Sequence, residues 1–382
     1  MTWRASRLGD VLTLKRGHDL PDSQRQEGDV PVVSSSGITG RHNQAKAKPP
    51  GVVTGRYGTL GEVFYLEEDY WPLNTALYVT DFKGNHPRFV AYFLQSVLRD
   101  YQSDKAAVPG VNRNVLHELK VRCPGTKVQE RIADILSAYD DLIENNRRRM
   151  ALLEEAARQL YREWFGRLRF PGHEHTRITN GMPEGWRRIA LADACESFED
   201  GDWVESKDQG GEDYRLLQIS NIGVNEFVET GNFRYVTEET FKRLNCREIL
   251  AGQILISRMP KPIGRAWLVT EMPWRMITAV DVAIVAPDPA IADQYLLTHF
   301  LNSPENLEHC ERRAVGATRP RVARRELASL PLLLPPPTLQ RNFRESAEPL
   351  NQQRANLYRQ NEKLRCARDL LLPRLMSGEI AV

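Results

Sequence analysis

The segment Pro124–Phe165 reads PGTKVQERIADILSAYDDLIENNRRRMALLEEAARQLYREWF, and a related segment follows at Pro335–Met376, PPPTLQRNFRESAEPLNQQRANLYRQNEKLRCARDLLLPRLM. The two segments align without a gap when the numbering is shifted by 211, so that Gln129 falls on Gln340. A constant offset over about forty residues indicates an internal duplication. The chain therefore consists of two related halves.

Each copy carries apolar residues at steps of three and four, which is the spacing of a coiled-coil seam. We predict two long helices, over 128–164 and 339–375, that pair with each other in opposite directions. The predicted seam residues are Ile132, Ile135, Tyr139, Leu142, Leu153 and Leu160 in the first copy, and Leu350, Leu357, Leu364 and Leu371 in the second. Separate surface helices, each with a solvated face, are the alternative.

Polar residues and a proline interrupt this seam. The steps of four from Leu142 to Asn146 to Met150 predict a stutter in the first helix. Asn146 and Asn361 fall at seam positions, where buried amides can fix the alignment of two helices. Pro349 lies inside the second copy, and we expect it to kink that helix or to delay its start.

Outside the helical segments the duplication is weaker, and its offset grows along the chain. The matched residues are Trp3, Leu8 and Asp10 with Trp186, Leu191 and Asp193 (offset 183); Gly61, Phe64, Trp71, Thr75 and Ala76 with Gly264, Trp267, Trp274, Thr278 and Ala279 (203); Phe93 with Phe300 (207); and Pro109 with Pro320 (211). The preserved order indicates one duplication followed by insertions in the second copy. Insertions gather in loops on a fixed scaffold, where binding specificity usually lies.

The predicted layout is a globular domain at 1–123, a helical spacer at 124–169, a second globular domain at 170–334 and a second spacer at 335–382. The strands predicted from short apolar runs are Val30–Val33, Gly51–Thr54, Val63–Tyr65 and Leu77–Val79 in the first domain, and Leu216–Ile219, Ile254–Ser257, Ala266–Val269 and Val282–Ile284 in the second. A helix follows each set, at Phe89–Gln102 and Gln294–Leu301. The expected fold class is mixed α/β (α+β): two globular domains separated by two long helices that form an antiparallel coiled coil, with an internal pseudo-two-fold repeat.

Composition indicates a globular protein of a reducing compartment. Hydrophobic residues make up 41% and charged residues 27% of the chain. The five cysteines form no C-x-x-C pair, which argues against a disulfide framework and a structural zinc site. The first residues lack the apolar core of a signal peptide, and no apolar run approaches the ~20 residues of a membrane span. We expect a cytoplasmic protein without a membrane partner.

Basic residues gather in three stretches that contain no acidic residue, Pro31–Gly61, Gly252–Arg265 and Arg312–Arg325, although the net charge is only +2. Such patches indicate one face that meets a polyanion, and arginine can grip guanine through two hydrogen bonds. The candidate DNA-contacting residues are Arg41, His42, Lys46, Lys48, Arg56, Tyr57, Arg113, Arg258, Lys261, Arg265, Arg319, Arg321 and Arg324. A scatter of solvated arginines is the alternative.

The sequence resembles the specificity (S) subunit of type I restriction-modification systems over essentially its whole length. The residues that carry the likeness are Leu371–Ile380 (LLPRLMSGEI), the paired openings Pro124–Gln129 and Pro335–Gln340, the stretch Gly61–Val79, and the Trp with Leu-x-Asp that opens each domain at Trp3 and Trp186. Each motif is loose by itself, and the ordered set is specific.

The resemblance implies a non-catalytic DNA reader. Its two target recognition domains would each bind half of a bipartite, asymmetric sequence in double-stranded DNA. The two helices would hold the domains apart and dock two methyltransferase (M) subunits, and restriction (R) subunits would join through the complex. No cofactor is implied for this chain, because S-adenosylmethionine, ATP and Mg²⁺ would belong to the partner subunits. A helix over 128–164 would span about 55 Å, or at most about 16 base pairs.

Other function classes find little support in the sequence. The adenine-pocket strings of a methyltransferase and a P-loop are absent. The string from Glu118 to Lys120 lacks the clustered carboxylates of a nuclease, and His173 and His175 lack further metal ligands. Two alternatives stay open: a coiled-coil scaffold that binds proteins without reading DNA, and a specificity partner of another methyltransferase-linked defence system. Steep salt dependence of DNA binding would argue against the scaffold.

Overall fold

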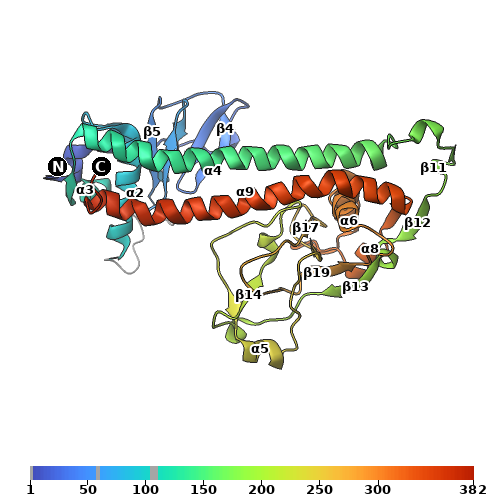
Figure 1. The fold of residues 1–382 in the computed structure, drawn as a ribbon. Coiled ribbons are helices and arrows are strands. Elements are labelled where there is room, and N and C mark those ends of the chain that lie inside the picture. The colour runs from blue at the N-terminus through green and yellow to red at the C-terminus, as the bar shows by residue number, and fades with distance from the viewer. Residues whose placement is uncertain (1–2, 57–60, 104–110) are drawn as a thin grey trace. The chain divides into compact units, whose positions relative to one another are not determined.

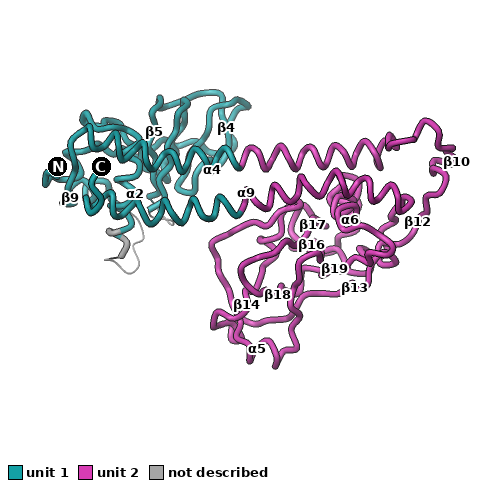
Figure 2. The backbone as a smooth tube through the Cα atoms, in the orientation of Figure 1, with its two compact units in different colours: residues 1–146, 359–382 teal, residues 147–358 magenta. Residues whose placement is uncertain are grey.

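The computed structural model describes residues 3–56, 61–103 and 111–382, and it divides into two compact units (Figure 2). Unit 1 comprises Met1–Asn146 with Arg359–Val382, and unit 2 comprises Arg147–Tyr358. Both units contain an α/β domain and a part of each long helix, α4 (Thr126–Tyr161) and α9 (Pro337–Ser377) (Figure 1). The fold class is therefore the predicted mixed α/β one.

The α/β domain of unit 1 is built on two sheets and one strand pair. The four-stranded sheet has the order β2-β8-β5-β6, the three-stranded sheet has the order β4-β3-β7, and β1 pairs with β9. The strands are β1 (Arg4–Arg7), β2 (Thr13–Arg16), β3 (Val30–Ser34), β4 (Gly37–His42), β5 (Gly51–Gly55), β6 (Val63–Leu66), β7 (Trp71–Pro72), β8 (Ala76–Asp81) and β9 (Lys120–Cys123). The helices are α1 (Leu8–Val11), α2 (Pro87–Ser103) and α3 (Arg113–His117).

The domain of unit 2 repeats this order strand by strand. Its sheets are β13-β19-β16-β17 and β15-β14-β18, and β12 pairs with β20. The strands are β12 (Arg187–Ala190), β13 (Cys195–Asp200), β14 (Tyr214–Leu217), β15 (Tyr235–Val236), β16 (Ile254–Ser257), β17 (Ala266–Leu268), β18 (Met276–Thr278), β19 (Val282–Pro287) and β20 (Pro331–Leu334), besides the short pair β10 (Ile178–Thr179) and β11 (Met182–Pro183). The helices are α5 (Glu238–Arg243), α6 (Gln294–Leu301), α7 (Pro304–Arg313) and α8 (Arg324–Ala328).

Backbone hydrogen bonds repeat between the two domains. The Gly17 amide donates to the Ala76 carbonyl at 3.1 Å, and the Gly201 amide donates to the Val282 carbonyl at 2.8 Å. Both positions require glycine, because an added Cβ would lie 2.1 Å from a backbone oxygen at Gly17 and 2.3 Å from one at Gly201. The duplication inferred from the helices therefore extends through the sheets.

Strand pairing corrects part of the sequence alignment. The offset of 203 matched Trp71 with Trp274, but Trp71 pairs with β3 in the way that Ile277 pairs with β14. The β-bridge made by Leu73 is likewise repeated by Ala279. Through β7 and β8 the offset is 206 (71 to 277), so three extra residues lie between β17 and β18. The predicted matches of Thr75 with Thr278 and of Ala76 with Ala279 are wrong for the same reason.

One buried glutamine in each unit fixes the start of a long helix to its domain. The side chain of Gln129 accepts a hydrogen bond from the His86 amide at 2.9 Å and donates to the carbonyl five residues before it at 2.8 Å. Gln340 accepts from the Asp293 amide at 3.0 Å and donates to the carbonyl five residues before it at 2.9 Å. Because both ends of each amide are paired, each side chain is held in one orientation.

The apolar core of each unit continues from the sheets onto the helix pair. In unit 1 it includes Ile132 and Leu136 of α4 with Leu375 of α9. In unit 2 it includes Phe165, at the end of the π-helical turn after α4, and Phe343 of α9, whose ring centroids lie 5.0 Å apart. Each part of the helix pair is thus a wall of the domain that it carries, and the division between units falls inside the helices.

The seam of each helix follows heptads without interruption. The inward positions of α4 are 132, 136, 139, 143, 146, 150, 153 and 157, at alternating steps of four and three. Ile143 is 3% exposed and Leu142 is 51% exposed, so the predictions of Leu142 in the seam and of a stutter are wrong. In α9 the equivalent heptad position holds Arg354, which is buried, while the neighbouring Gln353 is exposed. The other predicted seam residues are buried (Ile132, Leu357) or half-buried (Ile135, Tyr139, Leu153, Leu160, Leu350, Leu364, Leu371).

The two helices run antiparallel within each unit, as predicted. In unit 1 the Nη1 of Arg368 donates to Asp140 at 2.5 Å, and six residues further along α4 the Asn146 amide donates to Asn361 at 2.9 Å. In unit 2 Arg354 forms an ion pair with Glu154. In both units residue numbers fall along α9 as they rise along α4. The Asn146–Asn361 pair therefore forms the buried amide layer that the seam pattern indicated.

Pro349 does not delay the second helix, because α9 begins at Pro337 and continues unbroken to Ser377. Its ring is exposed, and the missing amide hydrogen leaves the carbonyl of Glu345, four residues earlier, without a helical donor. On an exposed helix face water can take that place, which is why the proline is tolerated here.

Candidate nucleic-acid interface

The arginines of unit 2 gather where the ends of β13 and β16 meet the start of α8. Asp200 accepts a hydrogen bond from Nη1 of Arg258 at 2.5 Å, and its other oxygen lies 3.6 Å from Nε of Arg324. Nε of Arg321 lies 3.0 Å from a carboxylate oxygen of Asp281. The result is a cluster of three arginines and two carboxylates at one end of the larger sheet.

Two of the predicted DNA-contacting arginines are buried inside the domain. Arg258 is 6% exposed, and its Nε donates to the carbonyl of Val322 at 3.1 Å. Arg265 is 7% exposed and donates to the carbonyls of Ile219, Ile222, Pro260 and Pro262. Burial lowers the pKa of both guanidinium groups. A buried charge needs such partners, so these side chains hold loops of their own domain together.

The remaining candidates of unit 2 are accessible. Arg319 and Arg324 are exposed, and Arg321 is half-buried. Lys261 is exposed and lies 2.7 Å from a carboxylate oxygen of Glu311. These four side chains come from the loop after β16, the segment after α7 and the start of α8.

The candidates of unit 1 divide in the same way. Arg41, Lys46, Lys48 and Arg113 are exposed, and Arg56 is half-buried. His42 is buried: its Nδ1 accepts from the Gln26 amide at 3.0 Å, and its ring meets Trp71 edge to face at 5.2 Å. Lys46 holds its ammonium group 5.1 Å from the centroid of the same tryptophan ring. Tyr57 lies outside the described residues.

Arg56 and Arg258 occupy equivalent positions in the two domains. The Arg56 amide donates to the carbonyl of Thr75 at 3.0 Å, and the Arg258 amide donates to that of Asp281 at 3.0 Å. Their own carbonyls accept from a valine amide at 2.9 Å and 3.2 Å. The next pair is Arg113 and Arg324, which are the first residues of α3 and α8. The two domains thus carry arginines at the same two places of one scaffold, and at the second place both arginines, Arg113 and Arg324, are exposed.

Three further charged residues lie beside these arginines, at strand ends outside the three basic stretches of the sequence: Lys15, Arg16 and Asp200. Arg16 and Asp200 end the equivalent strands β2 and β13, and Arg16 donates to the carbonyl of Asn74 at 3.2 Å. Identical residues in the two halves do not reveal this pair, because the two residues matched at offset 184 (16 to 200) are opposite in charge.

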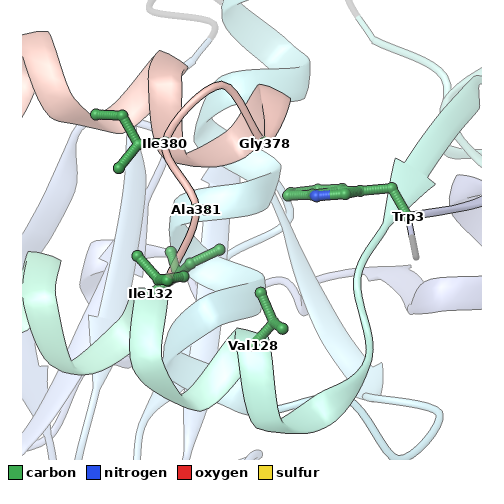
Figure 3. Close-up of a pocket in the computed structure, with 7 residues that line it drawn as sticks. Trp3, Val128, Ile132, Gly378, Ile380 and Ala381 are labelled. Atoms are coloured by element: carbon green, nitrogen blue, oxygen red, sulfur yellow. The ribbon is translucent and has the colours of Figure 1, made fainter. Parts of the chain in front are cut away.

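A cavity of about 330 Å³ in unit 1 lies where residues 378–382 fold back beside the start of α4 (Figure 3). Its lining includes Trp3, Val128 and Ile132. Gly378 ends α9 with a φ of +77°, and an added Cβ there would lie 2.4 Å from the Trp3 ring. This glycine explains the Ser-Gly of the sequence motif at 371–380, and the apolar lining assigns the cavity to the core and not to a charged ligand.

Neither a metal centre nor a membrane span emerges from the described part of the chain. There, no three His, Cys, Asp or Glu side chains come together in a group that could hold a metal ion. His173 points its Nδ1 to the carbonyl of Phe170 at 2.8 Å. Among the helices in these residues, none combines the length and apolar character needed to cross a bilayer.

Comparisons with known proteins agree on one family. Residues 1–155 match the model of the type I restriction modification DNA specificity domain. The chain is similar to the type I restriction enzyme MjaIX specificity subunit of Methanocaldococcus jannaschii, at 23% identity over 304 residues, covering 76% of this chain and 68% of that protein. The MjaVIII specificity subunit of the same organism is 20% identical over 286 residues, covering 74% and 67%.

A solved structure shares the fold. The S subunit of a type I restriction-modification system from M. genitalium matches with a TM-score of 0.57 at 16% identity, covering 98% of this chain and 96% of that one. The resemblance noted in the sequence is therefore confirmed: residues 1–155 match the family model, and the chain is similar to type I specificity subunits.

Proposed function

We propose that this chain, whose residues 1–155 belong to the family of type I restriction modification DNA specificity domains, is the DNA-recognition subunit of a type I restriction-modification complex. The observation that carries the proposal is the pair of α/β domains with one strand order, each carrying arginines at the same two places, of which Arg113 and Arg324 are exposed. In the proposed division, residues 1–123 and 170–334 are target recognition domains, and 124–169 and 335–382 are helical spacers.

The proposed target is a bipartite, asymmetric sequence in double-stranded DNA. Equivalent scaffolds that carry different side chains suit two different half-sites, because base edges are read by individual side chains while phosphates are bound without regard to sequence. The two helices would determine the gap between the half-sites. Lengthening one helix by about four residues, or ~6 Å, should then widen the preferred gap by one or two base pairs.

The chain would act without catalysis of its own. Two methyltransferase subunits would dock on it, and restriction subunits would join through that complex in the cytoplasm. Methyl transfer from S-adenosylmethionine and any step that uses ATP or Mg²⁺ would belong to those partners. The accessible candidates for DNA contact are Arg41, Lys46, Lys48, Arg56, Arg113, Lys261, Arg319, Arg321 and Arg324, and we assign the buried His42, Arg258 and Arg265 to positioning.

Sequencing methylated adenines in a host that expresses this chain with its methyltransferase partner tests the proposal. We expect one split motif with two unlike halves. Arg113→Ala should relax one half and Arg324→Ala the other, each by roughly 1–3 kcal/mol of discrimination. Arg325→Ala is the matched control, since Arg325 is 88% exposed beside Arg324. An unchanged methylation pattern in both variants would assign the arginines to phosphate contact.

A scaffold without DNA readout is the alternative. It predicts that the purified complex binds duplex DNA with an affinity that hardly changes between about 50 and 200 mM salt, whereas a reader that neutralises several phosphates loses affinity steeply over that range. The salt titration therefore decides between the two before any target sequence is known.

A further inference from the structure

Equivalent strand ends in the two domains carry opposite charge. Arg16 pairs with Leu77 at the end of β2, and Asp200 pairs with Ala283 at the end of β13. The segment Lys15-Arg16-Gly17-His18 therefore corresponds, residue by residue, to Glu199-Asp200-Gly201-Asp202. Both strands end beside the arginines described above, so the inversion changes the charge of the candidate interface itself.

In unit 2 the acidic strand end neutralises the arginines. Asp200 contacts Arg258 at 2.5 Å and Arg324 at 3.6 Å, and Asp281 contacts Arg321 at 3.0 Å. A DNA phosphate could reach these guanidinium groups only in competition with carboxylates that already hold them. Replacing one anion by another releases few counterions, so such a contact adds little to salt-dependent affinity.

In unit 1 the same places are basic. Arg16 stands where unit 2 has Asp200, and Thr75 stands where it has Asp281, beside Arg56 and Arg113. Lys15 and Arg16 are both exposed. The positive field acts on a neighbour: burial, together with Lys15 and Lys46, lowers the pKa of His18.

A count over matched positions gives the size of the difference. The positions are Lys15, Arg16, His18, Asp19, Arg56, Thr75 and Arg113 in unit 1, and Glu199, Asp200, Asp202, Trp203, Arg258, Asp281 and Arg324 in unit 2. With neutral histidine the formal charge is +3 in unit 1 and −2 in unit 2, and Arg321 brings unit 2 to −1. Arg247, which forms an ion pair with Glu199, adds one further positive charge in unit 2. Unit 1 therefore attracts a polyanion at this end of its sheet more strongly than unit 2 does.

We propose that the strand end Lys15–His18, which lies beside Arg56 and Arg113, is a phosphate-binding site for the DNA backbone, and that Asp200 is a positioning residue that holds Arg258 and Arg324 in unit 2. This inference rests on the proposed function. Unit 1 supplies most of the sequence-independent, salt-dependent attraction to DNA. Unit 2 contributes side chains held in fixed orientations, which favours discrimination between bases over attraction to any duplex.

The test uses the purified full chain and a short duplex of random sequence, with affinity measured by fluorescence anisotropy between about 50 and 200 mM salt. Lys15→Glu with Arg16→Glu should reduce the slope of log affinity against log salt by about 2, since each phosphate contact contributes roughly 0.9. Lys120→Glu with Arg122→Glu is the matched control. It makes the same change in net charge on exposed residues of β9, and the slope should change by less than half as much.

The reciprocal change is Glu199→Gln with Asp200→Asn. Removing the carboxylate frees Arg324 for phosphate, so the slope should become steeper by about 1. Asp200 supports the buried Arg258, so the thermal unfolding midpoint is measured alongside. If that variant unfolds, Arg16→Asp alone, which copies the residue of unit 2 onto an exposed site, should still flatten the slope.

The outcomes separate this inference from the proposed function. Wild-type affinity that does not depend on salt would contradict DNA readout itself. A steep wild-type slope that Lys15→Glu with Arg16→Glu leaves unchanged, or lowers no more than the β9 control does, would overturn the phosphate site while leaving the proposed function standing.

Discussion

Gln129 in unit 1 and Gln340 in unit 2 make the same pair of hydrogen bonds, whereas Arg16 and Asp200, at the ends of equivalent strands, carry opposite charge. The difference separates two kinds of position. Contacts that fix a long helix to its domain are the same in both units, and side chains that end strands at the candidate interface differ. Copying a residue from one unit into the equivalent place of the other therefore tests which kind a position is.

The largest effect is expected for Arg354→Ile, which copies Ile143 of unit 1 into unit 2. Arg354 forms an ion pair with Glu154 and donates to the carbonyl of Asn225 at 2.9 Å. The variant leaves the half-buried Glu154 with its hydrogen bond from Asn225 but without its cation, and burial already raises the pKa of that carboxyl. We expect the free energy of unfolding in urea to fall by about 3–5 kcal/mol.

Its control removes both charges. Arg354→Ile with Glu154→Leu should recover most of the loss, because two apolar residues of similar volume can replace a buried ion pair at little cost. A single variant as stable as the wild type would show that this pair is solvated in solution, and the contrast between the polar layer of unit 2 and the apolar seam around Ile143 would disappear.

As the pH falls, unit 2 should lose stability at a higher pH than unit 1. His299 is buried against the rings of Tyr161 and Phe343, its Nε2 has no hydrogen-bond partner, and burial lowers its pKa to about 4. The folded state keeps this histidine neutral while the unfolded chain binds a proton near pH 6.5. Stability is therefore full above about pH 6.5 and falls by roughly 3 kcal/mol as the pH drops toward 4.

The equivalent residue of unit 1 is Tyr92, which does not gain charge in this range. Urea unfolding at a series of pH values, followed by hydrogen exchange in each unit, measures the difference. His299→Phe should remove most of the acid sensitivity of unit 2. Equal loss of protection in both units, or an unchanged pH profile in the variant, would mean that another group is responsible.

A smaller effect is expected for Asn146→Leu, which copies Leu357 of unit 2. Asn146 donates to Asn361 at 2.9 Å inside the seam, so the variant leaves a buried amide without this partner, at about 1–3 kcal/mol. Asn361→Leu alone should cost a similar amount. The double variant should approach wild-type stability, because two leucines leave neither amide unpaired; a double variant worse than the sum of both would contradict the assigned pairing.

The smallest effect is expected for Leu142→Gln, which copies Gln353 of unit 2. Leu142 is 51% exposed, and exposed substitutions usually change stability by less than about 0.5 kcal/mol. Ile143→Ala, one residue away and 3% exposed, should cost roughly 2–4 kcal/mol. If the two results were exchanged in size, the heptad phase described for α4 would be wrong.

Much of the fold follows from apolar periodicity. The predicted strands at 30–33, 51–54 and 254–257 and the helix at 294–301 match β3, β5, β16 and α6 within a residue or two, because each is an apolar run bounded by glycine, proline or polar residues. Strands β2 and β13 escaped prediction, since Lys15-Arg16 and Glu199-Asp200 read as loop residues when their partner strand is unknown.

The helix seam shows where periodicity is insufficient. Leu142 and Ile143 are adjacent and both apolar, so either fits a seam when only two or three turns are considered. Extending the heptads through Leu136 and Met150 selects Ile143. In α9 the equivalent heptad position holds Arg354, which an apolar pattern cannot identify as a seam residue. Its burial is explained by the ion pair with Glu154, a residue far away along the chain.

The candidate interface could be predicted as a region but not residue by residue. Charge located the loops around Arg56 and Arg258, which the structure places at equivalent positions. Charge could not show that Arg265 donates to four carbonyls of its own domain. Every residue has a backbone carbonyl, so the sequence does not indicate which carbonyls will accept from an arginine.

The strand pairs β1·β9 and β12·β20 have a consequence for how this protein can change. Arg4 faces Cys123 and Arg187 faces Leu334, so the chain enters and leaves each α/β domain through neighbouring, hydrogen-bonded strands. The residues between these two strands can therefore vary in number without changing where the chain leaves the domain. The greater length of the domain in unit 2 therefore does not change the heptad phase of α9. An α/β domain can be enlarged or exchanged in evolution without a change in the helix that follows it.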